Sequence, residues 1–226
     1  MMFYDPTMIL LIPAVLLALW AQITVQSRFS HYSRVRSTVG MNGAQLARFI
    51  LDSAGLYDVK IETIPGSLTD HYDPRTKVVR LSQSTYSSES IAALGVVAHE
   101  IGHAIQHANN YAPLVIRNAI APVAQFSSNL AWIFFIIGLI TGAFGLAQFG
   151  IYLFVAVVAF SLITLPVEFN ASSRAIKILQ TNLAMPQEEL KGVKSVLGAA
   201  AMTYVAATLM AILQLLRMIF IARGRD

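Results

Sequence analysis

Cysteine is absent from all 226 residues of the chain. Thiolate metal sites, disulfides and thiol nucleophiles are therefore excluded, and a metal ion here must be held by His, Asp or Glu. Charge is scarce as well, because 12% of the residues are Asp, Glu, Lys or Arg, whereas soluble domains carry about 25%. With 56% hydrophobic residues and a net charge of +4, the composition indicates a membrane protein and favours no nucleic-acid partner.

Hydrophobic residues gather in four runs, each near the ~20 residues that a helix needs to cross a bilayer. Little more than "QFG" (148–150) separates the middle two runs. They should form a helical hairpin, in which the GxxxG spacing of Gly138 and Gly142 favours close contact. The first run is expected to be a retained anchor, because the features of a cleavable signal peptide are missing. The fourth run is either a span or a helix packed on the others. The runs cover residues 8–25, 130–147, 151–167 and 196–221.

Basic residues predict the orientation in the membrane. Segments 26–129 and 168–195 share one side of the bilayer if the middle pair is a hairpin, and together they hold 13 of the 16 Lys and Arg residues. The positive-inside rule places both segments, and any site within them, on the cytoplasmic side of the membrane. Arg217, Arg223 and Arg225 do not fit, because four full spans put them outside. The basic stretch 27–37 is expected to contact anionic lipid head groups.

About 100 residues between the first two runs resemble a soluble domain. Asn42, with Gln45 three residues later, predicts the start of a helix that Gly55 ends. Alternating residues predict strands over 59–64 and 77–82, and "DHYDPRT" (70–76) is typical of a turn. A helix is predicted over 88–108. We therefore expect a mainly α, multipass helical membrane protein with a small α+β domain.

The predicted order has five segments. An N-terminal transmembrane anchor (1–26) precedes the α+β domain (27–115). A linker helix and the transmembrane hairpin follow (116–167), and a further helix occupies 168–195. The chain closes with a transmembrane or membrane-packed helix and a basic tail (196–226).

The helix predicted over 88–108 contains "HEIGH", residues 99–103. His99 and His103 lie one turn apart on one face, so both imidazoles can reach one metal ion, and Glu100 lies beside the pair. In such sites zinc lowers the pKa of its water to about 7, and the glutamate accepts the proton as the water attacks a carbonyl. The plainer alternative is two histidines on a helix surface.

A catalytic zinc takes three protein ligands and one open position. His107 repeats the spacing, but eight residues of helix span about 12 Å, whereas ligands of one tetrahedral zinc lie about 3–3.5 Å apart. No Gly or Pro breaks the helix between His103 and His107, so His107 is expected beside the site rather than on the metal. Glu168 is the other candidate. A carboxylate at the end of an apolar run is costly unless it is functional or paired, and the alternative partners are Arg174 and Lys177.

Five motifs together carry a family resemblance: "FYDPT" (3–7), "HYDPR" (71–75), "LSQSTY" (81–86), "HEIGHAIQH" (99–107) and "EFNASSRA" (168–175). Over most of its length the chain resembles the YugP-type bacterial membrane zinc metallopeptidases and, more distantly, the HtpX-type and CAAX prenyl proteases. The resemblance implies a zincin-like domain of gluzincin type and one Zn2+ per chain, with His99, His103 and Glu168 as ligands and Glu100 as catalytic base.

One departure from the HtpX-type pattern concerns Ser172, where an Asp is usual. An Asp there could orient a zinc-bound histidine through a hydrogen bond. Asn170, Ser172 or Ser173 could take its place, and the sequence does not choose among them.

Further residues are candidates for roles around the site. His71 could stabilise the oxyanion, or serve only in its turn. Tyr204 could do so if the last helix packs over the site. Arg174 could bind a substrate carboxylate or Glu168, or simply flank the membrane. "KVVRLS" could be an edge strand that pairs with an extended substrate, or an ordinary strand. The strand candidates are Val78, Val79, Arg80 and Leu81.

These observations predict a zinc-dependent endopeptidase that cuts proteins or peptides at the membrane. Two alternatives stay open: a non-peptidase membrane hydrolase, and a zinc-bearing scaffold or adaptor without catalysis. Glu100 distinguishes the last, because a structural site does not need it. The expected partners are a protein or peptide substrate and the lipid bilayer, with a second copy of the chain or another membrane protein left open.

Overall fold

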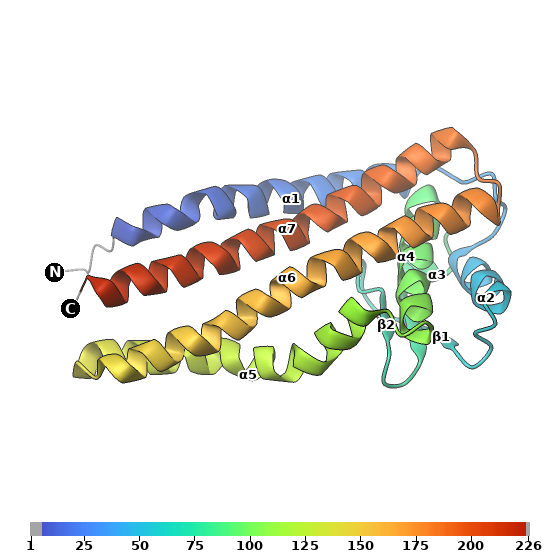
Figure 1. Cartoon of the computed structure of the whole chain (residues 1–226). Helices are drawn as coiled ribbons and strands as arrows, with labels where there is room; N and C mark the ends of the chain where they lie inside the picture. Colours follow the sequence, from blue (N-terminus) through green and yellow to red (C-terminus); the bar gives the residue numbers. More distant parts are fainter. Residues whose placement is uncertain (1–5, 225–226) are drawn as a thin grey trace. The chain divides into compact units, whose positions relative to one another are not determined.

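The computed structural model describes residues 6–224, so the first five residues of the predicted anchor and Arg225 of the basic tail lie outside the described residues. Helices dominate the architecture (Figure 1). Four helical segments are long and apolar enough to cross a membrane, which confirms the predicted mainly α, multipass fold. The long helices are α1 (Ile12–Tyr32, preceded by the 3-10 turn η1, Pro6–Leu11), α5 (Ala112–Thr141), α6 (Phe144–Thr181) and α7 (Gln187–Arg223).

The chain forms two compact units, each built from segments that are distant in the sequence. The helical unit comprises Met1–Gln22, Val115–Pro166 and Met202–Asp226. The α+β unit comprises Ile23–Leu114 and Val167–Ala201, and it contains every predicted metal ligand.

In the helical unit, α5 and α6 form the predicted hairpin, but it turns at Gly142 and Ala143, and the predicted turn at 148–150 lies inside α6. Glycines let the two helices approach closely. A Cβ on Gly138 would lie 2.3 Å from the backbone nitrogen of Ala147, and one on Gly150 would lie 2.8 Å from that of Phe135. Gly142 instead ends α5 in a left-handed conformation, with φ of 71°. The contact therefore uses Gly138 and Gly150 rather than the predicted pair, because Gly142 is needed for the turn.

The α+β unit contains a three-stranded sheet in the order β1-β3-β2. Strands β1 (Lys60–Ile64) and β3 (Val78–Ser82) match the two predicted strands and pair in parallel. The third strand, β2 (His71–Asp73), lies in the segment predicted as a turn and pairs antiparallel with β3. The turn prediction was wrong for these three residues.

The sheet order also corrects the prediction for the substrate strand. Strand β3 is central, so its backbone groups pair with β1 on one side and with β2 on the other. It cannot be the edge that accepts an extended peptide. In the described part of the chain, the edge strands are β1 and β2. The misassigned residues are Val78, Val79, Arg80 and Leu81.

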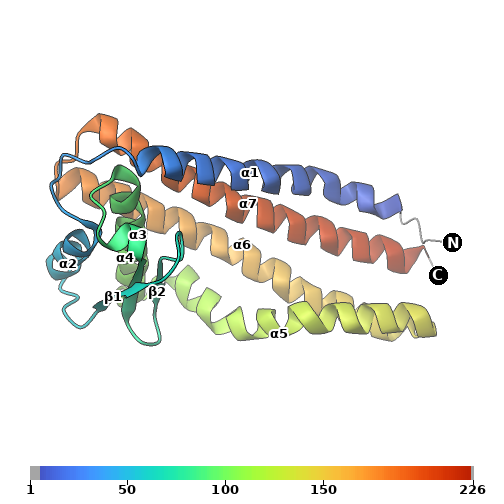
Figure 2. The same cartoon turned by 180° about the vertical axis from the view of Figure 1, so that it is seen from behind.

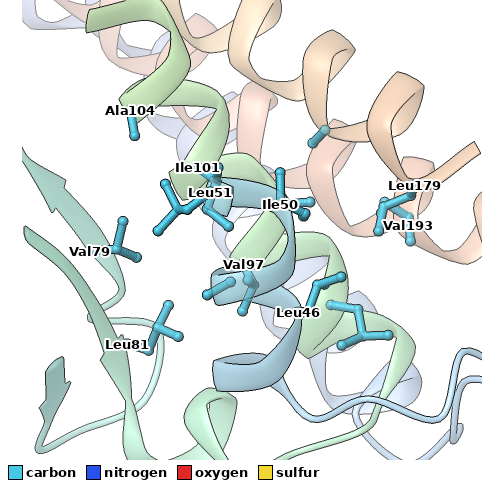
Figure 3. Close-up of a cluster of buried hydrophobic side chains, with 14 of the residues drawn as sticks. Leu46, Ile50, Leu51, Val79, Leu81, Val97, Ile101, Ala104, Leu179 and Val193 are labelled. Carbon is cyan, nitrogen blue, oxygen red and sulfur yellow. The ribbon is translucent and has the colours of Figure 1, made fainter. Parts of the chain in front are cut away.

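Capping residues define the helices that pack on this sheet. Asn42 and Gln45 form the predicted capping box at the start of α2 (Gly43–Ser53). The Ser90 hydroxyl caps α4 (Ile91–Ala108), and the short α3 (Gln83–Tyr86) precedes it. Figure 3 shows the core that these elements share with the first turns of α7 and the last turns of α6. Its members include Leu46, Ile50, Leu51, Val79, Leu81, Val97, Ile101, Leu179 and Val193.

A connector between α1 and α2 ties the start of α4 to the start of α7. The Ser37 hydroxyl, the Thr38 hydroxyl and the Thr38 backbone N–H all donate to the carboxylate of Glu189, whose side chain is buried. The backbone N–H of Ser37 donates to the Glu89 carbonyl, just before α4. This network satisfies a buried carboxylate, which would otherwise be costly.

Candidate metal centre

Helices α4 and α6 together assemble a cluster of two imidazoles and one carboxylate. His99 and His103 lie one turn apart on α4, with ring centroids 4.7 Å apart. Glu168 of α6 points between them, and its Oε2 lies 3.3 Å from Nε2 of His99 and 3.6 Å from Nε2 of His103. One ligand atom from each residue falls within 4.8 Å of the others. The three residues implied by the resemblance are thus brought together.

The donor set fits a zinc ion. Oε2 of Glu168 is buried and makes no hydrogen bond with any residue among those described, although both imidazole nitrogens face it. A buried carboxylate oxygen without a hydrogen bond is costly, and a cation held by all three side chains would remove that cost. Two histidines and one glutamate are the ligands of a familiar class of catalytic zinc sites.

Charge at the cluster favours a cation. Burial by itself lowers the pKa of His103, yet the neighbouring Glu168 and Glu100 carboxylates outweigh it, so that the pKa is raised. The two carboxylates therefore make this cluster attractive for positive charge, whether a proton or a metal ion supplies it.

Glu100 is held beside the cluster by the sheet. Its Oε2 accepts a hydrogen bond of 3.0 Å from the backbone N–H of Tyr72 in β2. Burial raises the pKa of Glu100, and the nearby imidazoles lower it less than burial raises it. A carboxylate with a raised pKa is better suited to accept and return a proton near neutral pH.

The two ligand-bearing helices approach each other closely. Gly102 of α4 faces the backbone of Ala171 in α6, and both Ala171 and Ala175 are completely buried. In Figure 2, α4 is seen beside β1 and β2, whose sheet supplies the contact to Glu100. The close approach brings Glu168, which precedes Ala171 by one helical turn, within reach of the imidazoles.

Hydrogen bonds orient both imidazoles from behind. Nδ1 of His99 lies 3.1 Å from the Ser172 hydroxyl, so Ser172, one of the three candidates from the sequence, is the one that contacts this imidazole among the described residues. Nδ1 of His103 lies 3.0 Å from Oε1 of Gln106. Gln106 was missed by the sequence analysis. No local signal could have found it, because two of its three partners lie on α6.

The remaining predicted residues lie around the cluster or outside it. Nδ1 of His107 lies 2.9 Å from the Tyr72 hydroxyl, whose pKa is raised to about 12 by burial, and His107 is not part of the metal cluster among the described residues. His71 is exposed, with Nδ1 2.9 Å from the Thr69 carbonyl oxygen. Side chains alternate along a strand, so His71 faces away from the side of the sheet that Tyr72 turns to α4.

Glu168 forms no ion pair with Arg174 or Lys177 among the described residues. Nε of Arg174 instead donates to Oδ1 of Asn170 over 2.7 Å, and its guanidinium lies 6.0 Å from the ring centroid of Tyr111. The alternative in which Arg174 or Lys177 neutralises Glu168 is therefore wrong.

Tyr204 lies on α7 within the helical unit, and its backbone carbonyl accepts a hydrogen bond from Thr208. Its role at the site stays a prediction.

Comparison with known proteins agrees with this chemistry. A family described as "Putative neutral zinc metallopeptidase" matches residues 7–223. The chain belongs to this family. A relative from Bacillus subtilis (strain 168), "Putative membrane protease YugP", is 50% identical over 218 residues, which cover 96% of this chain and 97% of the relative. No solved structure matches the chain significantly. The resemblance to the YugP-type family inferred from the five motifs is confirmed, and zinc is the metal that the family implies.

Proposed function

We propose that this protein is a zinc-dependent membrane endopeptidase of the HExxH gluzincin type, with one zinc ion per chain. The observation that carries the proposal is the convergence of His99, His103 and the buried, otherwise unbonded Oε2 of Glu168 beside Glu100. Zinc at these ligands would polarise the substrate carbonyl and acidify the attacking water.

Glu100 acts as the general base. The Tyr72 N–H occupies its Oε2, which leaves Oε1 to accept the proton of the attacking water and to return it to the departing amine. The same N–H fixes the direction of the carboxylate, so Glu100 needs little rearrangement at the moment of reaction.

Substrate binding is assigned to the edge of β2. This strand is short and lies at the end of the sheet in the described part of the chain, and its Tyr72 contacts the catalytic base directly. An extended peptide that adds to β2 by backbone hydrogen bonds would pass beside Glu100. Four apolar helices in the same chain make membrane proteins, or peptides at the bilayer surface, the expected substrates.

The basic residues favour a cytoplasmic location for the site in a bacterial plasma membrane. Lipid is the expected surrounding partner of the four apolar helices, and a second copy of the chain or another membrane protein could join it.

The test compares the wild-type protein with Glu100→Gln, both purified in detergent. Both should contain one zinc per chain, while the variant should cleave membrane-associated peptide substrates about 10²–10⁴-fold more slowly. Glu62→Gln on β1 is the matched control and should cleave normally, since an exposed ion pair with Arg80 contributes little. Undiminished cleavage by Glu100→Gln would contradict the proposal, and absence of peptide cleavage by zinc-loaded wild type would favour a scaffold or another hydrolase.

A further inference from the structure

Gln106 is the largest polar side chain that is completely buried near the cluster. It lies three residues after His103 on α4 and uses both ends of its amide. Nε2 is 2.9 Å from the Val167 carbonyl oxygen and 2.9 Å from Oδ1 of Asn170, both on α6. Oε1 is 3.0 Å from Nδ1 of His103. One side chain thus connects a predicted zinc ligand on α4 to the helix that carries Glu168.

The direction of each hydrogen bond in the series from Arg174 to His103 is fixed by groups that can only donate or only accept. The Val167 carbonyl can only accept, and Nε of Arg174 can only donate. Because Arg174 donates to Oδ1 of Asn170, that atom is an acceptor and Nε2 of Gln106 must donate to it. The amide nitrogen of Gln106 therefore faces α6, and its carbonyl oxygen faces His103.

The consequence concerns the tautomer of His103. Oε1 of Gln106 can only accept, so Nδ1 of His103 must carry the hydrogen and the lone pair of a neutral ring must lie on Nε2. That atom is the one that faces Oε2 of Glu168. His99 differs, because its Nδ1 faces the Ser172 hydroxyl, which can donate or accept.

We propose that Gln106, held by Asn170 and Arg174, is a positioning residue that fixes His103 in its Nδ1–H tautomer and aims Nε2 at the metal. This inference rests on the proposed function, since it assumes that the cluster binds zinc. Partners behind a metal-bound histidine commonly act in this way. Here the Gln106 amide also connects α4 to α6, so the orientation of His103 and the spacing of the two helices depend on the same side chain.

Arg174 lies at the far end of the hydrogen-bonded series that runs through Asn170 and Gln106 to His103. Its guanidinium lies over the ring of Tyr111, which follows α4, while its Nε donates to Asn170. Because Arg174 donates to Oδ1 of Asn170, that atom stays an acceptor, and the Gln106 amide can meet it only through its nitrogen.

The first experiment measures zinc affinity by competition with a chromophoric chelator. Gln106→Met keeps the size of the side chain but removes both hydrogen-bonding ends, and it should weaken zinc binding about 10–100-fold. Gln106→Glu retains the acceptor for His103 and should recover part of the loss. Gln83→Met, on the exposed surface of α3, is the matched control and should bind zinc as wild type does. Affinity within twofold of wild type for a folded Gln106→Met would overturn the inference.

The second experiment needs no variant of Gln106. Nitrogen-15 NMR of the histidines in metal-free wild-type protein at pH 9 reports which ring nitrogen carries the hydrogen, and His103→Asn identifies the signal. His103 should carry it on Nδ1, and a hydrogen on Nε2 would overturn the inference even if Gln106→Met failed to fold. Neither measurement depends on peptide cleavage, so the peptidase activity can fail while zinc binding and the positioning role of Gln106 stand, and the reverse.

Discussion

Gly102 of α4 and Ala171 of α6 are in backbone contact: a Cβ at position 102 would lie 2.8 Å from the Ala171 carbonyl oxygen. A real Cβ does not approach a backbone oxygen so closely, so any side chain at Gly102 must push the two helices apart. These helices carry the two histidines and Glu168, respectively. The distance between the two histidines and Glu168 therefore depends on the absence of a side chain at position 102.

The substitution Gly102→Ala should destabilise the protein by on the order of 1–3 kcal/mol and should weaken zinc binding. The matched control is Gly198→Ala on α7, where no heavy atom of the described residues lies within 4 Å of the added Cβ. Because alanine is the better helix former by up to ~1 kcal/mol, Gly198→Ala should be neutral or stabilising. Denaturation curves and zinc content check both variants, and equal effects at the two positions would contradict the packing argument.

The ligand assignment predicts different outcomes for two candidate residues. Glu168→Gln should lose zinc, whereas His107→Ala should retain one ion per chain, because His107 is engaged with the Tyr72 hydroxyl. Zinc should also raise the melting temperature of the wild-type protein, since a ligand that binds only the folded state stabilises it by mass action. Chelation should reverse this shift in wild type and should leave Glu168→Gln unchanged. The assignment is wrong if zinc loss follows His107→Ala instead.

Asp73 makes the folding stability of the α+β unit depend on pH in the acidic range. Hydrogen bonds from the Thr76 hydroxyl, the Arg75 backbone N–H and Arg80 lower the pKa of Asp73 to about 2. The folded-state pKa lies below the unfolded value of 3.8, so this contribution to stability is present above about pH 4 and is lost as the pH falls toward 2.

Asp73→Asn should therefore cost about 1 kcal/mol at pH 7, after allowance for solvent screening, and progressively less between pH 4 and pH 2. Asp52→Asn, which removes one partner of an exposed ion pair with Arg48, is the control and should change little. Thermal unfolding across this pH range tests the pair. A penalty for Asp73→Asn that is independent of pH would exclude the electrostatic explanation.

The connector at Ser37 and Thr38 makes a prediction about two adjacent glutamates. Glu189 accepts three hydrogen bonds from the connector in a buried position, whereas the side chain of Glu188 is 82% exposed. Glu189→Ala leaves these donors without their acceptor and should destabilise by about 1–3 kcal/mol. Glu188→Ala should be nearly neutral. Limited proteolysis of residues 33–41 provides the measurement: faster cleavage is expected for Glu189→Ala alone.

Local patterns accounted for much of the fold. The periodicity and caps of α2 and α4 depend on neighbouring residues, so Asn42, Gln45 and the "HEIGH" helix could be recognised without a structure. Strand β2 could not, because three residues are too few for an alternating pattern and the Asp73-Pro74 turn signal masks them. The pairing of β2 with β3 places β2 at the sheet edge and β3 at the centre, and local sequence patterns do not reveal this pairing.

The candidate metal ligands also could be predicted only in part from local patterns. His99 and His103 follow from helical spacing, but Glu168 lies sixty-five residues beyond His103 and was assigned through the family motif. Gln106 was invisible as a functional residue. Its burial is created by α6, and its three partners come from positions 103, 167 and 170, which no local pattern joins.

The separation of the ligands in the chain has a consequence for biosynthesis. His99 and His103 are translated before α5, and Glu168 follows only after the turn between α5 and α6 and most of α6 itself. At roughly 5–20 residues per second, the third ligand emerges from the ribosome about 3–13 s after His103. A nascent chain therefore lacks a complete metal centre while its hairpin is still being made. The order of translation itself delays completion of the ligand set until α5 and most of α6 have been synthesised.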